Sequence, residues 1–191
     1  MKGLLPAALV LASACARGGA PPVAATLPDF TMTAVGPSTE APFGLRDMRG
    51  RVWIVDFIYT RCGGPCPLLS AQMAELAQSL PPEVGLLTVT VDPDGDTPER
   101  LRAYAKSYGA DARRWVFLRG TITDTYQLLY AGFHLTMSSD PKADPQTRVL
   151  HSTRFVLVDR AGGIRGYYDG LSALDNAALA RDARRLLEAG T

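Results

Sequence analysis

The sequence predicts an α/β fold with a central, partly parallel sheet, because strand-like and helix-like segments alternate along the chain. Residues 52–59 and 85–91 are short apolar runs rich in β-branched residues, which is typical of strands buried on both faces. Between them, apolar residues recur at helical spacing from 69 to 80. This alternation favours a central mixed sheet flanked by helices.

The segment before the first central strand predicts an N-terminal hairpin extension. Residues 27–33 have strand character, and Pro28 near their start favours a short edge strand. Residues 36–50 contain turn-forming residues and predict a hairpin and a turn region.

The middle of the chain continues the alternation of strands and helices. Residues 92–96 read Asp-Pro-Asp-Gly-Asp and predict a turn. A helix should begin directly afterwards, because Thr97 suits the N-cap position and Pro98 suits the first helical turn. Residues 115–118 then predict a short strand, and residues 123–131 predict a helix.

The last third of the chain contains one irregular stretch. Residues 132–150 are polar and contain two prolines, so we expect a surface loop inserted before a late strand at 153–158. A turn then returns the chain antiparallel at 164–168. Residues 173–189 carry an apolar stripe and should form the closing helix.

The composition suits one globular domain, expected at residues 27–191. The 20 Lys and Arg residues nearly balance the 19 Asp and Glu residues, which gives a formal net charge of +1. This balance gives no indication of a nucleic-acid partner.

The first residues predict an export signal. Residues 1–14 contain Lys2, an apolar run and small residues directly before Cys15. We expect a lipoprotein-type signal that leaves Cys15 acylated, followed by a flexible linker at 15–26. Ordinary signal cleavage, with Cys15 incidental, is the alternative. Either process places the domain outside the cytoplasm of a bacterium, and acylation would make it a membrane-anchored lipoprotein of the cell envelope.

Cys62 and Cys66 lie where the first central strand meets the following helix. Amide N–H groups at a helix N-terminus favour a thiolate, and Arg61 adds a positive charge beside Cys62. Positions four apart on a regular helix hold their Cβ atoms about 5–6 Å apart, whereas a disulfide needs about 3.5–4.5 Å. Cys62 should therefore lie partly in a loop, with the freedom that glycines 63 and 64 supply. A redox pair and a metal site both remain possible.

Four motifs support a family assignment. They are Tyr59-Thr60-x-Cys62-x-x-x-Cys66-Pro67; Val91-Asp92-Pro93 with Asp96-Thr97-Pro98; Leu101-x-x-Tyr104-Ala105; and His151-Ser152 before Phe155-x-Leu157-Val158-Asp159. From about residue 27 to its end, the chain resembles the Sco/SenC family of thioredoxin-like copper proteins, which help to assemble cytochrome oxidase. The resemblance implies a thioredoxin-like fold in which Cys62, Cys66 and His151 bind one copper ion, as Cu(I) or Cu(II).

Two functions follow from this resemblance. The first is a copper carrier that serves the copper-bearing subunit of cytochrome c oxidase and exchanges copper with other chaperones. The second is a thiol-disulfide oxidoreductase that reduces the cysteines of that copper site, with Cys62 attacking and Cys66 resolving. The motif departs from the family at Arg61 and at residues 63–65. A peroxidase is excluded, because Tyr59 and Gly63 replace the threonine or serine of the peroxiredoxin pattern.

Several other residues have alternative interpretations. His134 and Met137 are possible copper ligands, but with no third partner they are expected to be ordinary loop or helix-end residues. Asp92 and Asp96 could shape the wall of the site, although turn and N-cap roles explain both. Asp56 lies inside an apolar strand, so it either supports proton transfer near the dithiol or points to a solvated face.

Overall fold

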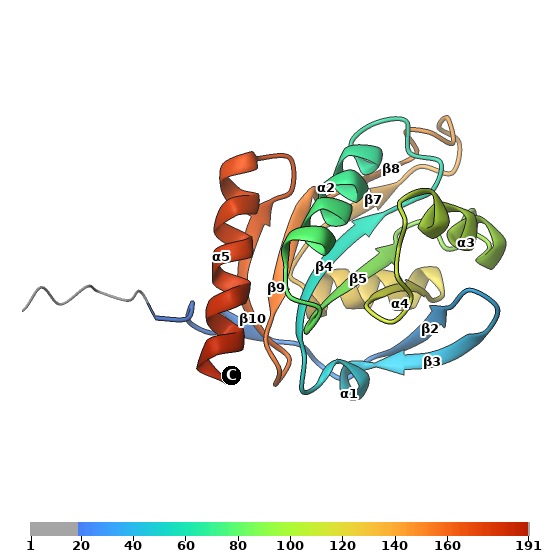
Figure 1. The fold of residues 1–191 in the computed structure, drawn as a ribbon. Helices are drawn as coiled ribbons and strands as arrows, with labels where there is room; N and C mark the ends of the chain where they lie inside the picture. Colours follow the sequence, from blue (N-terminus) through green and yellow to red (C-terminus); the bar gives the residue numbers. More distant parts are fainter. Residues whose placement is uncertain (1–18, 191) are drawn as a thin grey trace, which may run out of the picture.

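The computed structural model describes residues 19–190, which form an eight-stranded mixed sheet with helices on both faces (Figure 1). The strands of this sheet, in spatial order, are β1 (Ala25–Thr26), β10 (Gly163–Asp169), β9 (Arg154–Val158), β4 (Val52–Ile58), β5 (Val84–Thr90), β6 (Trp115–Arg119), β2 (Thr31–Val35) and β3 (Glu40–Gly44). A separate two-stranded sheet pairs β7 (Met137–Ser139) with β8 (Val149–His151).

The centre of the large sheet is parallel, as the sequence predicted. β4 pairs with β5 and β5 pairs with β6, both in parallel. On the other side of β4, β9 pairs antiparallel with β4 and also antiparallel with β10. Every residue of β4 and β5 is buried. A strand covered on both faces needs apolar side chains in both directions, which explains the continuous apolar runs.

Helices cover both faces of the sheet. α2 (Cys66–Ser79), α3 (Pro98–Ser107) and α5 (Ala173–Ala189) pack on one apolar cluster. α1 (Leu45–Met48) and the π-helical turn η1 (Leu128–Gly132), which continues α4 (Ile122–Gln127), pack on the other. In Figure 1, α2 and α5 lie in front of the sheet and α4 lies behind it. The carboxyl end of β4 leads into the loop that carries Cys62.

The helix signals in the sequence were reliable. The Thr97 side chain accepts a hydrogen bond from the amide of Arg100, and α3 begins at Pro98 as predicted. α5 has the predicted bounds and ends at Gly190, whose φ of 69° is the left-handed conformation that glycine adopts readily.

Three predictions of local structure were wrong in part. The predicted edge strand at 27–33 begins only at Thr31, and β2 lies between β6 and β3, so β3 is the edge strand. Strand character is local, whereas the choice of neighbour depends on long-range packing. The predicted helix at 123–131 is divided between α4 and η1. The predicted loop at 132–150 contains β7 and most of β8.

The N-terminal predictions fall mostly outside the described residues. The expected signal at 1–14 and its Cys15 lie there. Within the expected linker at 15–26, the carbonyl of Pro21 accepts a hydrogen bond from Arg165, and β1 pairs with β10. Among residues 19–190, no helix has the length and apolar character needed to cross a membrane.

Candidate metal centre

Cys62 and Cys66 lie at the carboxyl end of β4, the central strand. β4 ends at Ile58, and α2 begins at Cys66 with a proline in its first turn. Cys62 therefore lies in the loop, as its spacing from Cys66 predicted. The Cys62 thiol is half-buried and the Cys66 thiol is fully buried, and both are free.

His151 reaches the cysteines from the other end of the chain. It is the last residue of β8 and pairs across the small sheet with Met137. Its Nδ1 lies 2.9 Å from the carbonyl oxygen of Ser152. Since a carbonyl can only accept, Nδ1 carries a proton, and Nε2 faces Cys66 Sγ, 3.3 Å away. A backbone carbonyl that fixes the tautomer of a histidine is common at metal sites.

The three donor atoms could share one ion. The sulfurs of Cys62 and Cys66 and a ring nitrogen of His151 lie within 4.8 Å of one another. Zinc, for comparison, bonds to sulfur at about 2.3 Å and to nitrogen at about 2.0–2.1 Å, so one ion bridges donors up to about 4.6 Å apart. The spacing of the three donor atoms is therefore close to what one ion needs. Two sulfurs and an imidazole suit a soft ion such as Cu(I).

The two thiols differ in acidity. Burial opposes ionisation of Cys62, but hydrogen bonds from His151, from the Cys66 side chain and from the amides of Cys66 and Gly64 lower its pKa to about 6. Burial raises the pKa of Cys66, and the neighbouring Cys62 raises it further. Cys62 is therefore the thiolate at neutral pH and Cys66 the protonated partner.

This difference gives a direct test of the site. The alkylation rate of Cys62 by iodoacetamide should rise with pH to a half-maximum near pH 6, because only the thiolate reacts. Cys66→Ser leaves Cys62 as the sole thiol in the motif and isolates its titration. A half-maximum in that variant at or above the ordinary value of about 8.5 would contradict the hydrogen-bonded arrangement.

Arg61, predicted to place a positive charge beside Cys62, forms an ion pair with Asp92. Its Nη2 lies 3.0 Å from a carboxylate oxygen of Asp92, so the guanidinium is paired with that side chain. The hydrogen bonds at Cys62 account for the lowered pKa. Sequence proximity suggested a contact with Cys62 because it could not show the ion pair with Asp92.

Asp56 is buried, and the interpretation as a residue on a solvated face was wrong. Its exposure is 0%, and one carboxylate oxygen accepts a hydrogen bond from Thr88 at 2.6 Å. The other oxygen is buried with no hydrogen-bond partner. Burial raises the pKa of this carboxyl group to about 7. The strand pattern could not reveal this, because β4 is covered on both faces.

His134 is not among the converging donor residues, and Met137 is the cross-strand neighbour of His151. His134 is exposed, and its φ of 51° places it at a left-handed bend after η1. Met137 is half-buried against the core in β7. Met32 and Met73 are core residues.

Sequence reasoning missed one contributor, the backbone carbonyl of Gln146. It accepts hydrogen bonds from the Tyr59 hydroxyl at 2.6 Å and from the Gly63 amide at 3.1 Å. These bonds tie the loop before β8 to the cysteine loop. No side-chain signal could have found them, because any residue type supplies a carbonyl.

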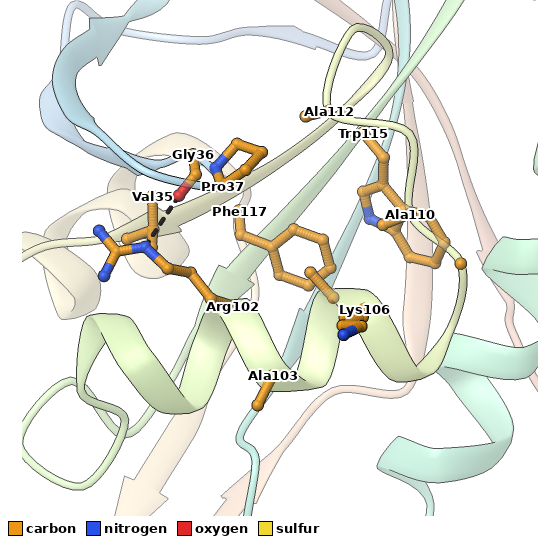
Figure 2. A pocket seen from close by; sticks show the side chains of 12 residues that line it. Val35, Gly36, Pro37, Arg102, Ala103, Lys106, Ala110, Ala112, Trp115 and Phe117 are labelled. Carbon is orange, nitrogen blue, oxygen red and sulfur yellow. Dashed lines mark hydrogen bonds between the residues drawn. The ribbon is translucent and has the colours of Figure 1, made fainter.

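Another hollow in the molecule is separate from this centre. A cavity of about 540 Å³ lies between α3 and the turn after β2, and Phe117 and Trp115 are among the residues that line it (Figure 2). Arg102 donates there to the carbonyl of Gly36 at 2.9 Å. None of its lining residues is a cysteine or a histidine, so it does not contribute to the metal centre.

Known proteins share both sequence and fold with this chain. A family model described as SCO1/SenC matches residues 21–188. A SCO1 protein homolog of Bacillus subtilis (strain 168) is 30% identical over 130 residues, covering 66% of this chain and 66% of that protein. The chain thus spans about two thirds of the length of the curated relatives that it matches.

The comparison with solved structures agrees with the sequence comparison. A SCO1/SenC family lipoprotein from Bacillus anthracis str. Ames is 31% identical, with a TM-score of 0.74 over 85% of this chain and 95% of that one. Bradyrhizobium japonicum ScoI, solved with copper bound, is 19% identical, with a TM-score of 0.70 over 85% and 99%. The thioredoxin-like α/β fold is therefore confirmed. On these sequence and structural matches, the chain belongs to the SCO1/SenC family.

Proposed function

We propose that this protein is a copper carrier that assists assembly of the dinuclear copper site of cytochrome c oxidase. The observation that supports it most is the convergence of Cys62, Cys66 and His151, whose donor atoms lie within 4.8 Å of one another. Thiolates select soft ions, and imidazole tolerates both Cu(I) and Cu(II). A Cys₂His set also occurs at zinc. Copper is favoured because the family is described as one of cytochrome c oxidase assembly proteins and its members have been solved with copper bound.

Exposure of the donors supports transfer rather than permanent storage. Cys66 is buried, whereas Cys62 and His151 are only half-buried. A recipient can therefore approach the ion from the side of Cys62 and His151 and replace these ligands one at a time. The copper ion is cargo in this proposal, and the recipient is the copper-bearing subunit of the oxidase.

The protein acts at the cell envelope in this proposal. Residues 1–14 direct export, acylated Cys15 anchors the chain in the membrane, and residues 15–26 lead to the domain at 27–191. The description of the Bacillus anthracis relative as a lipoprotein supports this anchoring. Other copper chaperones would supply the ion on the same side of the membrane.

A transfer assay tests the proposal. The reduced, Cu(I)-loaded protein is mixed with the copper-free soluble domain of the oxidase subunit, the two proteins are separated, and the copper content of the recipient is measured. Wild type should load the recipient, whereas Cys62→Ser should not, because it lacks one of the two sulfur donors. Equal loading by both proteins would contradict the carrier function.

A thiol-disulfide oxidoreductase is the second candidate, and the unequal acidity of the two thiols favours it. The Cys62 thiolate would attack a disulfide of the recipient, form a mixed disulfide and release one recipient thiolate. Cys66 would then lose its proton and attack Cys62 Sγ, which forms the Cys62–Cys66 disulfide and releases the second recipient thiolate. The recipient is reduced by two electrons and this protein is oxidised by two.

The two functions differ in their need for His151. Thiol exchange needs only the cysteines, so His151→Ala should still reduce a recipient disulfide. Copper transfer needs all three donors and should be weakened in the same variant.

A further inference from the structure

Besides the Gln146 carbonyl, a buried carboxylate joins the two segments that carry the donor atoms. Cys62 and Cys66 belong to the loop before α2, and His151 belongs to the β7–β8 hairpin, which is far away in the sequence. Asp92, in the turn after β5, contacts both segments. We propose that Asp92 is a positioning residue that keeps the histidine hairpin in register with the cysteine loop, an inference that rests on the copper-binding function proposed above.

The contacts of Asp92 use both of its carboxylate oxygens. Oδ2 accepts a hydrogen bond from Nη2 of Arg61, the residue beside Cys62, at 3.0 Å. Oδ1 accepts from Nη2 of Arg148, three residues before His151. The Asp92 side chain is 6% exposed, whereas those of Arg61 and Arg148 are 30% and 21% exposed. One buried negative charge therefore binds two cations that come from opposite sides of the site.

Asp92 is itself fixed to the centre of the fold. Its amide donates to the Thr90 hydroxyl at 3.1 Å, and its Oδ1 accepts from the amide of Gly95, also at 3.1 Å. Thr90 ends β5, which pairs along its whole length with β4, the strand that carries the cysteine loop. The hairpin is thus joined to the rigid sheet and not merely to another loop.

Gly95 shows how tightly this cluster is packed. A Cβ atom at this position would overlap the guanidinium of Arg61 and the carboxylate of Asp92, and would lie 2.7 Å from Nη2 of Arg148. Real Cβ atoms do not approach other heavy atoms so closely. Gly95→Ala should therefore displace the cluster without removing any of its charges.

Removing the charge of Asp92 should release the hairpin. Two guanidinium groups would then face each other without the anion between them, and their repulsion would favour separation of the two segments. Residues that orient metal ligands typically change metal affinity by about 10–100-fold when they are replaced. The loss should act through His151, because Arg148 holds the segment that ends there.

The test is a Cu(I) competition titration of the reduced full chain, with a matched control. Asp92→Asn should weaken Cu(I) binding by about 10–100-fold. Asp159→Asn breaks another buried ion pair, with Arg165 at 2.6 Å, in the turn between β9 and β10, and should leave the affinity unchanged. Arg148→Lys should retain more of the affinity than Arg148→Met, because it keeps a cation for Asp92. Equal losses in Asp92→Asn and Asp159→Asn would overturn the proposal.

A double mutant tests whether Asp92 affects Cu(I) affinity through His151. In a His151→Ala background, Asp92→Asn should cost much less affinity than in wild type, since the ligand that it positions is already absent. Additive losses would show that Asp92 acts elsewhere and would also overturn the proposal.

Hydrogen exchange tests the positioning role without copper. Backbone amides of the β7–β8 hairpin should lose protection in Asp92→Asn and keep it in Asp159→Asn, while amides of β4 and β5 stay protected in both. If wild type takes up no tight Cu(I) while this pattern is seen, the copper function fails and the positioning role stands. If the hairpin amides keep their protection in Asp92→Asn, the positioning role fails whatever the copper affinity.

Discussion

Oxidation of Cys62 and Cys66 to a disulfide should abolish tight Cu(I) binding. The disulfide removes two of the three donor atoms and leaves His151, and a single imidazole cannot hold the ion against a competing chelator. Copper uptake should be measured anaerobically on the oxidised protein, and again after a reductant has been added and removed. We expect no tight equivalent at first and full recovery after reduction.

The control for this prediction is the protein in which both cysteines are serine. Its weak binding should not respond to oxidant or reductant, because it contains no dithiol in the motif. Tight binding by the oxidised wild type, with the disulfide verified by mass spectrometry, would contradict the three-donor site. The result matters for function because it would make copper release depend on thiol redox state.

Replacing Asp56 with asparagine should raise the free energy of unfolding at pH 8 by up to about 4 kcal/mol, because the pKa of its carboxyl group is raised by about 3 units. The group has a pKa of about 7 in the folded protein and about 3.8 in the unfolded chain. Between these values the unfolded chain binds fewer protons, so wild-type stability falls as the pH rises from about 4 to 7 and the Asp56 contribution is constant above that. Asparagine does not titrate, so Asp56→Asn should not show this fall in stability with rising pH.

Urea unfolding between pH 4 and pH 8 measures the effect, as the difference between wild type and Asp56→Asn. The difference should be small at the acidic end and reach its plateau above pH 7. Asp159→Asn is a control of opposite sign, because the ion pair lowers the pKa of Asp159 and its contribution is lost as the pH falls. Parallel pH profiles for wild type and Asp56→Asn would contradict the raised pKa of the buried Asp56 carboxyl group.

The central fold could be predicted from the sequence because its signals are local. The apolar runs of β4 and β5, the cap at Thr97 and the apolar stripe of α5 each identify an element without reference to the rest of the chain. The position of β2 between β6 and β3 could not be predicted in this way. It depends on pairing between segments far apart in the sequence, which leaves no local pattern.

At the candidate site, too, local signals could be predicted from the sequence and long-range contacts could not. Cys62 and Cys66 were identified by spacing at a strand–helix junction, and His151 was identified through the family motif. What the sequence could not show is how these residues are held. The carbonyl of Gln146 and the double ion pair of Asp92 arise from contacts between distant loops. The ion pair of Arg61 was missed for the same reason, since its partner Asp92 lies in another loop.

The most direct test of the metal centre is an anaerobic Cu(I) competition titration of the reduced protein beside His151→Ala. The proposed site predicts one tight equivalent in wild type, weakened by about tenfold or more when the imidazole ligand is lost. His151→Ala should still form the Cys62–Cys66 disulfide, because the histidine is no part of it. Weak binding by wild type, or equal affinity in both proteins, would contradict the three-donor copper site.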